Sequence, residues 1–195
     1  EAVDVPEIQE FTSLSEKELD RINTLVQNLL KITKLDAGSI VLEKKPEDVA
    51  EMMNDVELRF SYRAEQEQKK LVLFGEEDIF LSCDRDWILE AVDNIVKNAM
   101  DHTKSGDTIE IKWRKSASIV QIQIKDNGSG IHPEDLHHIF KRFYRSRFSK
   151  DQQGIGLGLP LAKMIIEAHN GTIEVNSELG KGTMFTIGFL IPTKL

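Results

Sequence analysis

The fold of this chain is decided by the stretch NIVKNAMDHT, residues 94–103. It ends a segment from about Asp86 to His102 in which apolar residues recur every three or four positions, so we predict an amphipathic helix capped by Asp84. On another face of this helix Asn94, Asn98 and His102 recur every four residues. Asn is a poor residue for a helix interior, but its side-chain oxygen can bind Mg²⁺. The stripe is therefore a candidate binding site, and the alternative is an ordinary solvated helix face.

The sequence around this helix alternates between strand and helix patterns. Seven segments have the composition of short strands, and two of them, at residues 109–113 and 120–124, alternate apolar with polar residues as half-buried antiparallel strands do. The seven segments cover residues 40–43, 71–74, 79–83, 109–113, 120–124, 172–177 and 183–191. Further helices are predicted after Pro46 as far as about Gln68, and from near Gly156 to His169. Helices on one side of a mostly antiparallel sheet indicate an α+β fold in two layers.

A separate amphipathic helix is predicted near the start of the chain. Between Leu14 and Leu35 apolar residues recur at steps of three or four, and Asp36-Ala37-Gly38-Ser39 supplies the residues of a helix end. We therefore place a boundary near residue 40, between a first unit of residues 1–40 and a second of residues 41–195. The apolar seam of the helix either packs on the second unit or faces a partner helix in a bundle, and its periodicity does not decide between them.

The composition excludes some classes of function. With 33 acidic against 25 basic residues the net charge is −8, which argues against a broad basic face for nucleic acid. The hydrophobic content of 40% suits a globular protein, and the single cysteine, Cys83, follows an apolar run and is expected to be buried. No apolar run reaches the roughly 18 residues of a membrane span. Because the chain begins with acidic residues and without Met, we expect a soluble part of a longer protein.

The stretch DNGSGI, residues 126–131, follows a predicted strand and has the features of a binding loop. Its two glycines permit close approach of a ligand, and the carboxylate of Asp126 can accept a hydrogen bond from an amino group. A hairpin turn is the alternative for such a sequence. We favour the loop because Ile131-His132-Pro133 introduces a predicted helical stretch that runs through Phe140, and no returning strand follows directly.

Two further motifs flank the polar stretch Ser146–Gln153. FKRFYR, residues 140–145, combines aromatic and basic side chains, which suits a lid whose arginines neutralise a phosphoryl group; the alternative is core phenylalanines with surface arginines. GIGLGL, residues 154–159, leads into a helix, whose first N–H groups can hold a phosphate. GKGT, residues 180–183, is not a P-loop, because a predicted strand follows it.

The order of these five motifs resembles that of the N, G1, F, G2 and G3 boxes of sensor histidine kinases. The ATP-binding domain of that family is shared with gyrase, MutL and the Hsp90 chaperones, and the resemblance covers roughly residues 40–192. It implies a left-handed β-α-β sandwich, in which a mixed sheet of about five strands packs against three helices. It also implies that the chain binds ATP and Mg²⁺.

The resemblance assigns roles to individual residues. Asn98 would coordinate Mg²⁺, Asn94 would lie beside the phosphates, and Asp126 would bind the adenine amino group. Asn94, Arg142 and Arg145 would be the catalytic residues, with one of the two arginines reaching the γ-phosphate. The expected nucleotide contacts are Asn94, Asn98, Asp101, His102, Asp126, Gly128, Gly130, Ile131, Tyr144, Gly154, Gly156, Leu157, Gly158, Leu159 and Thr183.

At two positions this chain differs from other members of the family that it resembles. In gyrase-like proteins a glutamate that activates water stands at the position of Asn94, and an amide cannot act as a general base. This favours a kinase over two alternatives, a nucleotide-gated ATPase of the gyrase or Hsp90 type and an anti-sigma-type serine kinase. Many family members carry a basic, phosphate-contacting residue near Asp101, and Lys97 or Lys104 is the candidate replacement here.

The first helix ends in LLKITKLDAG, residues 29–38, which resembles the second helix of the family's dimerisation hairpin. The hairpin's first helix carries the phosphoacceptor histidine in an H-E-x-R-x-P-like motif, and none of the five histidines here lies in one. We therefore expect no autophosphorylation by this chain alone. The expected partners are its own phosphoacceptor hairpin, a response regulator and a second copy of the parent protein. The expected location is the cytoplasmic part of a membrane-anchored bacterial sensor kinase.

Overall fold

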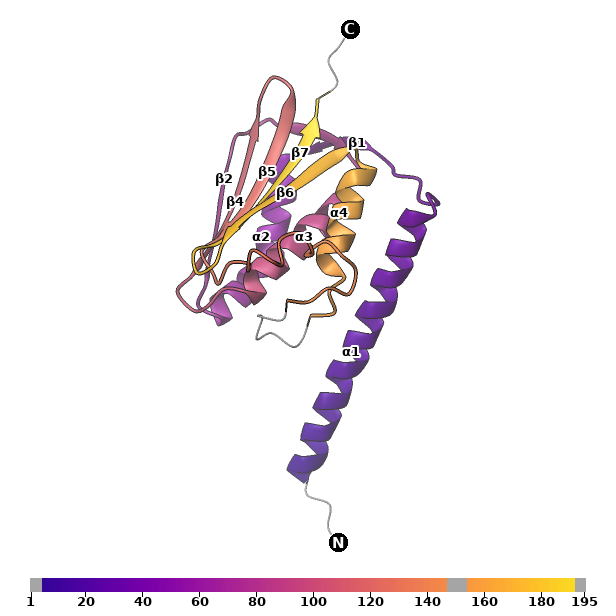
Figure 1. Cartoon of the computed structure of the whole chain (residues 1–195), viewed down its shortest axis with the longest axis vertical. Coiled ribbons are helices and arrows are strands. Elements are labelled where there is room, and N and C mark those ends of the chain that lie inside the picture. Colours follow the sequence, from indigo (N-terminus) through magenta and orange to yellow (C-terminus); the bar gives the residue numbers. More distant parts are fainter. Residues whose placement is uncertain (1–4, 147–153, 192–195) are drawn as a thin grey trace.

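A five-stranded sheet and three helices form a two-layer body, and a fourth, long helix projects from it (Figure 1). The computed structural model describes residues 5–146 and 154–191. In chain order the elements are α1 (Val5–Asp36), β1 (Lys45–Asp48), α2 (Val49–Gln66), β2 (Lys70–Gly75), β3 (Phe80–Cys83), α3 (Arg85–Asp101), β4 (Thr108–Lys115), β5 (Ile119–Asp126), α4 (Gly158–Ala168), β6 (Gly171–Glu178) and β7 (Gly182–Leu190). The predicted α+β sandwich is confirmed.

The main sheet has the strand order β2-β4-β5-β7-β6, and β1 pairs separately with β3. Only the β2–β4 pair is parallel, so the sheet is mixed, as the resemblance implies. Val120, Ile122 and Ile124 of β5 are almost completely buried beneath the helices, since alternate residues of a strand face the same side. Helix α3 buries the predicted apolar face, including Ile88 and Ile95, in the same core. Cys83 is fully buried, which raises the pKa of its thiol to about 12.

The segment between α1 and α2 differs from the sequence prediction. Residues 40–43 form no strand; the strand is β1, which begins at Lys45 and pairs with β3. Asp84 is the N-cap residue of α3, as predicted, but its carboxylate makes no capping hydrogen bond and instead accepts one from the N–H of Glu43 (3.0 Å). Helix α2 begins after Asp48, whose side chain accepts from the N–H groups of the first turn. The shifted strand and the different use of the Asp84 carboxylate have one cause: residues 43–48 bond to residues 80–84, about 40 positions later in the chain.

The predicted helical stretch from Pro133 to Phe140 is wrong as a helix. The chain there forms successive turns, in which the N–H of Asp135 bonds to His132 O and that of His138 bonds to Asp135 O. Asp135 is only 3% exposed and accepts a hydrogen bond from the Tyr144 hydroxyl (2.5 Å). The turns bury the Asp135 carboxylate, where it bonds the Tyr144 hydroxyl. A helix on the surface would leave this carboxylate in solvent.

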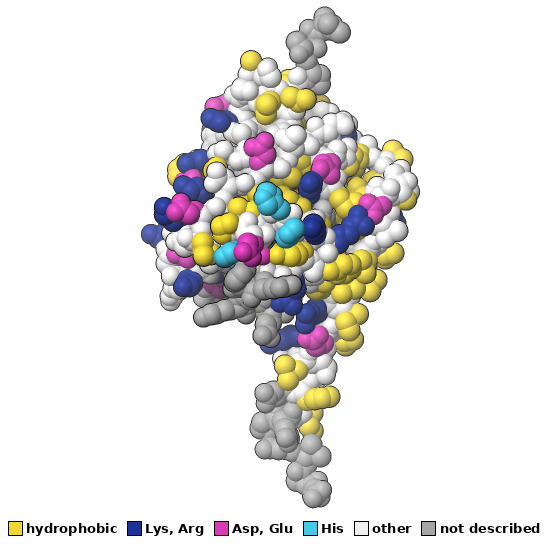
Figure 2. Space-filling model, in the orientation of Figure 1, with side chains coloured by type: hydrophobic (Ala, Val, Ile, Leu, Met, Phe, Trp, Pro, Cys, Tyr) yellow, Lys and Arg dark blue, Asp and Glu magenta, His cyan; other side chains and the backbone are white. Residues whose placement is uncertain are grey.

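Helix α1 is bound to the body only along its last turns. Ile32 is 2% exposed, and two ion pairs join the helix to the body, Lys31–Glu90 (2.6 Å) and Asp36–Arg142 (2.7 Å). Its preceding turns carry exposed apolar side chains, namely Ile8, Phe11, Leu14, Leu19, Ile22, Val26 and Leu30. Figure 2 shows hydrophobic side chains on the surface of the projecting helix. The end of the predicted seam therefore packs on the body, and the partner-helix alternative for its exposed part stays a prediction. Within the described ranges no helix has the length and apolarity that crossing a membrane requires.

Candidate functional site

Three loops meet at the end of α3 and form one end of the candidate site. The N–H of Ser129, in the loop after β5, donates to the backbone oxygen of His102 (3.1 Å). The N–H of Gly180, in the turn between β6 and β7, donates to Ser129 O (2.8 Å). Gly128 fits this arrangement because it has no side chain: a Cβ there would lie 2.3 Å from His102 O. The predicted motifs at residues 94–103, 126–131 and 180–183 are therefore brought together.

Asp126 lies at the centre of these loops and is 4% exposed. Its Oδ1 accepts hydrogen bonds from the N–H groups of Gly128 (2.9 Å) and Thr183 (3.2 Å). Burial raises the pKa of the Asp126 carboxyl, against the opposing effect of these two bonds. Among the described residues its other oxygen, Oδ2, has no hydrogen-bond partner. A buried carboxylate with one open oxygen is suited to accept a hydrogen bond from a ligand amino group.

The remaining residues predicted at this end line the same loops. Ile131 donates its N–H to Ser177 Oγ (2.9 Å), and that hydroxyl also contacts the hydroxyl of Thr183 (3.0 Å). Gly130 lies against the backbone of Glu178. Asn127, which the sequence analysis did not single out, accepts the N–H of Thr108 (2.7 Å) and so ties the loop to β4. This end of the site is thus held mainly by backbone hydrogen bonds.

The other end of the site lies where α4 begins beside α3. The amide nitrogen of Asn94 donates to Glu90 O (2.8 Å), and its Oδ1 faces Gly158, where a Cβ would approach to 2.8 Å. Leu157 occupies the N-cap position of α4 and provides no side-chain cap. The first N–H groups of a helix need partners from outside the helix, and they attract anions. Asn94 therefore lies next to an uncapped helix start.

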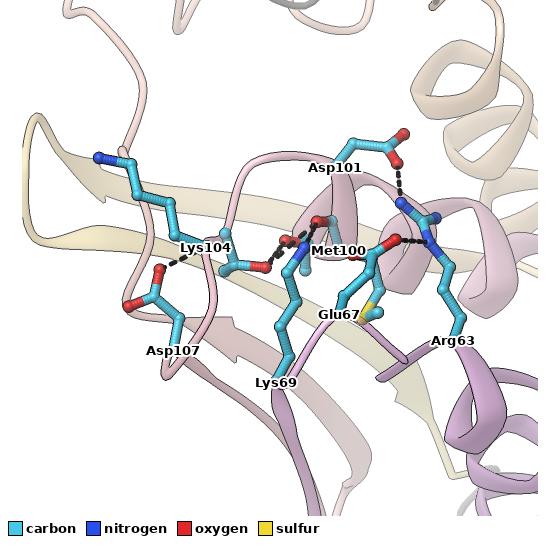
Figure 3. A network of polar contacts seen from close by, with 9 residues as sticks. Arg63, Glu67, Lys69, Met100, Asp101, Lys104 and Asp107 are labelled. Carbon is cyan, nitrogen blue, oxygen red and sulfur yellow. Dashed lines mark hydrogen bonds and ion pairs between the residues drawn. The ribbon is translucent and has the colours of Figure 1, made fainter. Parts of the chain in front are cut away.

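The half-buried Asn98 lies one turn beyond Asn94, and in the described structure its amide has no hydrogen-bond partner. Asp101, three residues further, is paired with Arg63 of α2 (2.7 Å). Figure 3 shows this pair within a larger network, from which the Lys104 side chain points away. Arg63 was not predicted, because nothing in the local pattern of α2 marks it. Its guanidinium places a positive charge beside Asp101, and a phosphate contact by Lys97 or Lys104 stays a prediction.

The aromatic and basic segment is only partly directed toward the site. Phe140 packs edge-on against Phe185 in the core, as its alternative interpretation predicted, whereas Phe143 is exposed. Arg142 is turned to α1, where it pairs with Asp36, and the exposed Arg145 has contacts of its own.

The two sides of the predicted lid meet at its base. The N–H of Phe143 donates to Gly156 O (2.9 Å), and Gly156 lies against the backbone of Tyr144. Beyond Gly156, Leu157 is buried and Leu159 is half-buried, while Gly154 has open space around it. Residues 147–153 of the predicted lid lie outside the described part of the chain.

These features define the class of protein. The two-layer sandwich, the buried aspartate at the end of β5, the asparagine stripe on α3 and the uncapped α4 are the features that the resemblance to an ATP-binding domain implies. Residues 83–194 match the family described as "Histidine kinase-, DNA gyrase B-, and HSP90-like ATPase", and the chain belongs to this family. ATP is therefore the nucleotide of this domain.

Within the family the chain is a catalytic ATP-binding domain of the histidine kinase type. It is 36% identical over 183 residues to the sensor protein SrrB of Staphylococcus aureus, a match covering 93% of this chain and 31% of SrrB. The chain thus spans about a third of the length of the curated relatives it matches.

Two solved structures show the same fold. The histidine kinase AdeS of Acinetobacter baumannii is 25% identical with a TM-score of 0.78, covering 94% of this chain and 84% of AdeS. Full-length ShkA, crystallised in complex with AMPPNP, is 23% identical with a TM-score of 0.82, covering 96% of this chain and 39% of ShkA.

Proposed function

We propose that this domain transfers the γ-phosphoryl group of Mg-ATP to a histidine outside these 195 residues, for relay to an aspartate of a response regulator. The observation that carries the proposal is Asn94, whose amide lies beside the start of α4 and cannot accept a proton from water. The carboxylate one turn earlier, Glu90, is held by Lys31 of α1 (2.6 Å). Neither residue is suited to activate water, so transfer to a supplied imidazole nitrogen is favoured over hydrolysis.

The proposal assigns the two ends of the site to the two ends of ATP. The adenine amino group donates to the open Oδ2 of Asp126, and the phosphates lie at the uncapped start of α4 beside Asn94 and Gly158. Asn98 holds Mg²⁺ with its free amide oxygen. A magnesium ion bound to nucleotide phosphates keeps several waters and needs few protein ligands, so one amide fits it.

Arg142 and Arg145 are the candidate cations for the γ-phosphate. For Arg142 this role requires release from Asp36, because the guanidinium now faces α1. Arginine at this step stabilises charge that develops on the transferring group. The lid glycines Gly154 and Gly156 permit the movement that the role demands.

The proposal also takes residues 1–40 as the second helix of a phosphoacceptor hairpin and residues 41–195 as the catalytic domain. The exposed apolar stripe of α1 is suited to pack in a four-helix bundle formed by two copies of the parent protein. The name of SrrB, a sensor protein, and the solved complex of the histidine kinase ThkA with the response regulator TrrA support a sensor kinase role. A membrane anchor in the parent protein is part of this proposal.

The test supplies the missing acceptor in trans. A complete dimerisation hairpin of the parent protein is incubated with this chain and radiolabelled Mg-ATP, and acid-labile phosphate is measured on each component. We expect label on the added hairpin and none on this chain alone, and Asn98→Ala should abolish transfer. ATP hydrolysis without labelled hairpin, or acid-stable phosphoserine on a partner, would overturn the proposal. A rise in ATPase activity on Asn94→Glu would be consistent with the role assigned to that position.

A further inference from the structure

Lys69, in the loop between α2 and β2, is an unusually buried lysine. Its side chain is only 7% exposed, and its ammonium group donates to Glu67 Oε2 (2.5 Å) and to the backbone oxygen of Met100 (2.6 Å), as Figure 3 shows. Lysine is seldom buried unless it is paired. Burial by itself would raise the pKa of Glu67, but hydrogen bonds from Lys69 and Arg63 leave that pKa below its usual range. The buried end of Lys69 therefore meets the carboxylate of Glu67, whose own side chain is 34% exposed.

The second partner of Lys69 belongs to the last turn of α3. The final carbonyl groups of a helix have no partner within the helix, and a cation near them is stabilising. The Thr103 hydroxyl also donates to this turn, at Ala99 O (2.8 Å) and Met100 O (3.2 Å). Lys69 thus supplies a charged cap to the helix that carries the asparagine stripe.

The capped turn holds the loop that contains Asp126. His102, one residue after α3, accepts the N–H of Ser129 (3.1 Å) through its backbone oxygen, and Gly128 packs against the same oxygen. The N–H of Gly128 in turn donates to Asp126 Oδ1 (2.9 Å). A continuous set of short contacts therefore connects the Lys69 ammonium to the Asp126 carboxylate.

The loop that carries Lys69 has other attachments of its own. Gln68 accepts the N–H of Gly106 (2.8 Å) and bonds the Ser105 hydroxyl (2.9 Å), while Lys70 donates its N–H to Asp107 O (2.9 Å). These contacts keep the loop in place when the Lys69 side chain is shortened or neutralised. The effect of the ammonium on the end of α3 can therefore be measured separately from the path of the loop.

We infer that Lys69 is a positioning residue of the nucleotide site, which acts through Met100 and His102 to hold the Asp126 loop in the geometry that binds adenine. The inference rests on the adenine role proposed for Asp126. Lys69 itself touches no nucleotide. Its contribution is to fix the last turn of α3, so its loss affects the adenine end and leaves the phosphate end intact.

The test compares Lys69→Met with Lys70→Met in this 195-residue chain. Lys70 is the adjacent, exposed lysine, so the same substitution there is a matched control. Dissociation constants for adenosine and for ATP are measured by NMR titration, and the hydrogen exchange of the Ser129 amide is measured without nucleotide. We expect Lys69→Met to raise both dissociation constants by the same factor, about tenfold, and to speed exchange at Ser129. Lys70→Met should change none of these.

The outcomes separate this inference from the proposed function. A folded Lys69→Met chain whose adenosine dissociation constant stays within about twofold of the wild-type value would overturn the inference alone. A wild-type chain that binds no adenosine would overturn the adenine role of Asp126, and the inference with it. If Lys69→Met does not fold, Glu67→Gln decides, because it removes the charge that orients the ammonium: about a threefold rise is expected, and an unchanged constant overturns the inference.

Discussion

The two ends of the helical layer differ in whether the protein itself provides all the hydrogen-bond partners of their polar side chains. At the end where α3 begins and α4 finishes, His169 is 7% exposed, its Nε2 accepts the N–H of Asp84 (3.2 Å) and its Nδ1 bonds Ile165 O (2.8 Å). At the end where α3 finishes and α4 begins, Asp126 Oδ2 and the Asn98 amide have no partner among the described residues. The first end is closed by the protein itself, and the second is left for a ligand.

This difference agrees with the site that the sequence motifs indicate. A buried polar group without a partner costs roughly 1–3 kcal/mol, and among the described residues the fully buried side-chain atoms in that state are Asp93 Oδ1, Asp135 Oδ2 and His138 Nδ1. Asp126 Oδ2 and the Asn98 amide also lack partners but are not fully buried, so a ligand can reach them. Both ends use the same kinds of residue, a helix terminus and one buried titratable side chain. The two ends differ in how completely these particular groups are hydrogen-bonded by the protein. Three substitutions test this comparison.

The largest effect is expected for Asp126→Asn. The Asn oxygen can still accept the N–H groups of Gly128 and Thr183, but its NH₂ group would then face the adenine amino group, donor against donor. ATP affinity should fall at least about a hundredfold, because a site built to bond a ligand N–H rejects the mismatched partner strongly. Isothermal titration calorimetry measures the loss.

The matched control is Asp93→Asn, the same change on α3 at a carboxylate that faces Arg59 of α2. It should lower the melting temperature and leave ATP affinity nearly unchanged. Equal losses of affinity in the two variants would show that the open oxygen of Asp126 is not the adenine acceptor.

An intermediate effect is expected for Gly158→Ala at the start of α4. The added Cβ would lie 2.8 Å from Asn94 Oδ1, so the Asn94 amide must shift from its position where the phosphates are proposed to bind. ATP affinity should fall about tenfold while adenosine affinity is retained, a separation that titration with both ligands detects. Gly154→Ala adds the same methyl group into open space and should change neither affinity. Loss of adenosine affinity in Gly158→Ala would contradict the division of the site into two ends.

The smallest effect on function is expected at the closed end, for His169→Gln. Burial lowers the pKa of His169 below its ordinary value of 6.5, so the unfolded chain binds more protons than the folded one just below that pH. The free energy of unfolding should therefore fall as pH drops below about 6.5, and His169→Gln should remove this part of the pH dependence at a cost of about 1 kcal/mol near pH 7.5. Urea unfolding across pH measures both.

ATP affinity should be unchanged in His169→Gln, because His169 lies at the end opposite Asp126. His137→Gln, a change at an exposed histidine, is the control and should leave the pH dependence as it is. A loss of ATP affinity in His169→Gln would break the separation between the two ends.

The sequence predicted the features that depend on local pattern. The core face of α3, the asparagine stripe and the loop after β5 are each encoded within about 20 residues, where periodicity and glycine placement are informative. The helices α2 and α4 and the strands from β2 onward were also placed nearly correctly for this reason.

The features that depend on distant contacts were missed. The Asp84 carboxylate bonds a backbone group 41 residues away, and Arg142 pairs with a residue 106 positions earlier. Lys69 and Lys70 are adjacent lysines that the sequence does not distinguish. Only the side chain of Lys69 is buried, and its ammonium group bonds the last turn of α3. Periodicity indicates which face of an element is buried, but it does not indicate which charged neighbour reaches that face.

The attachment of α1 has a mechanical consequence. The helix has 32 residues and is about 48 Å long, and both of its ion pairs to the body lie within its last two turns. The helix therefore has a long part that projects from the body and a short part that is attached to it. The attached part bonds Glu90, which lies one turn before Asn94, and Arg142, which lies just before the base of the lid. Partly exposed ion pairs of this kind contribute only about 1 kcal/mol or less each, so the buried Ile32, with Leu29 and Leu35 packed on the core beside it, provides the main attachment against a force on the projecting part.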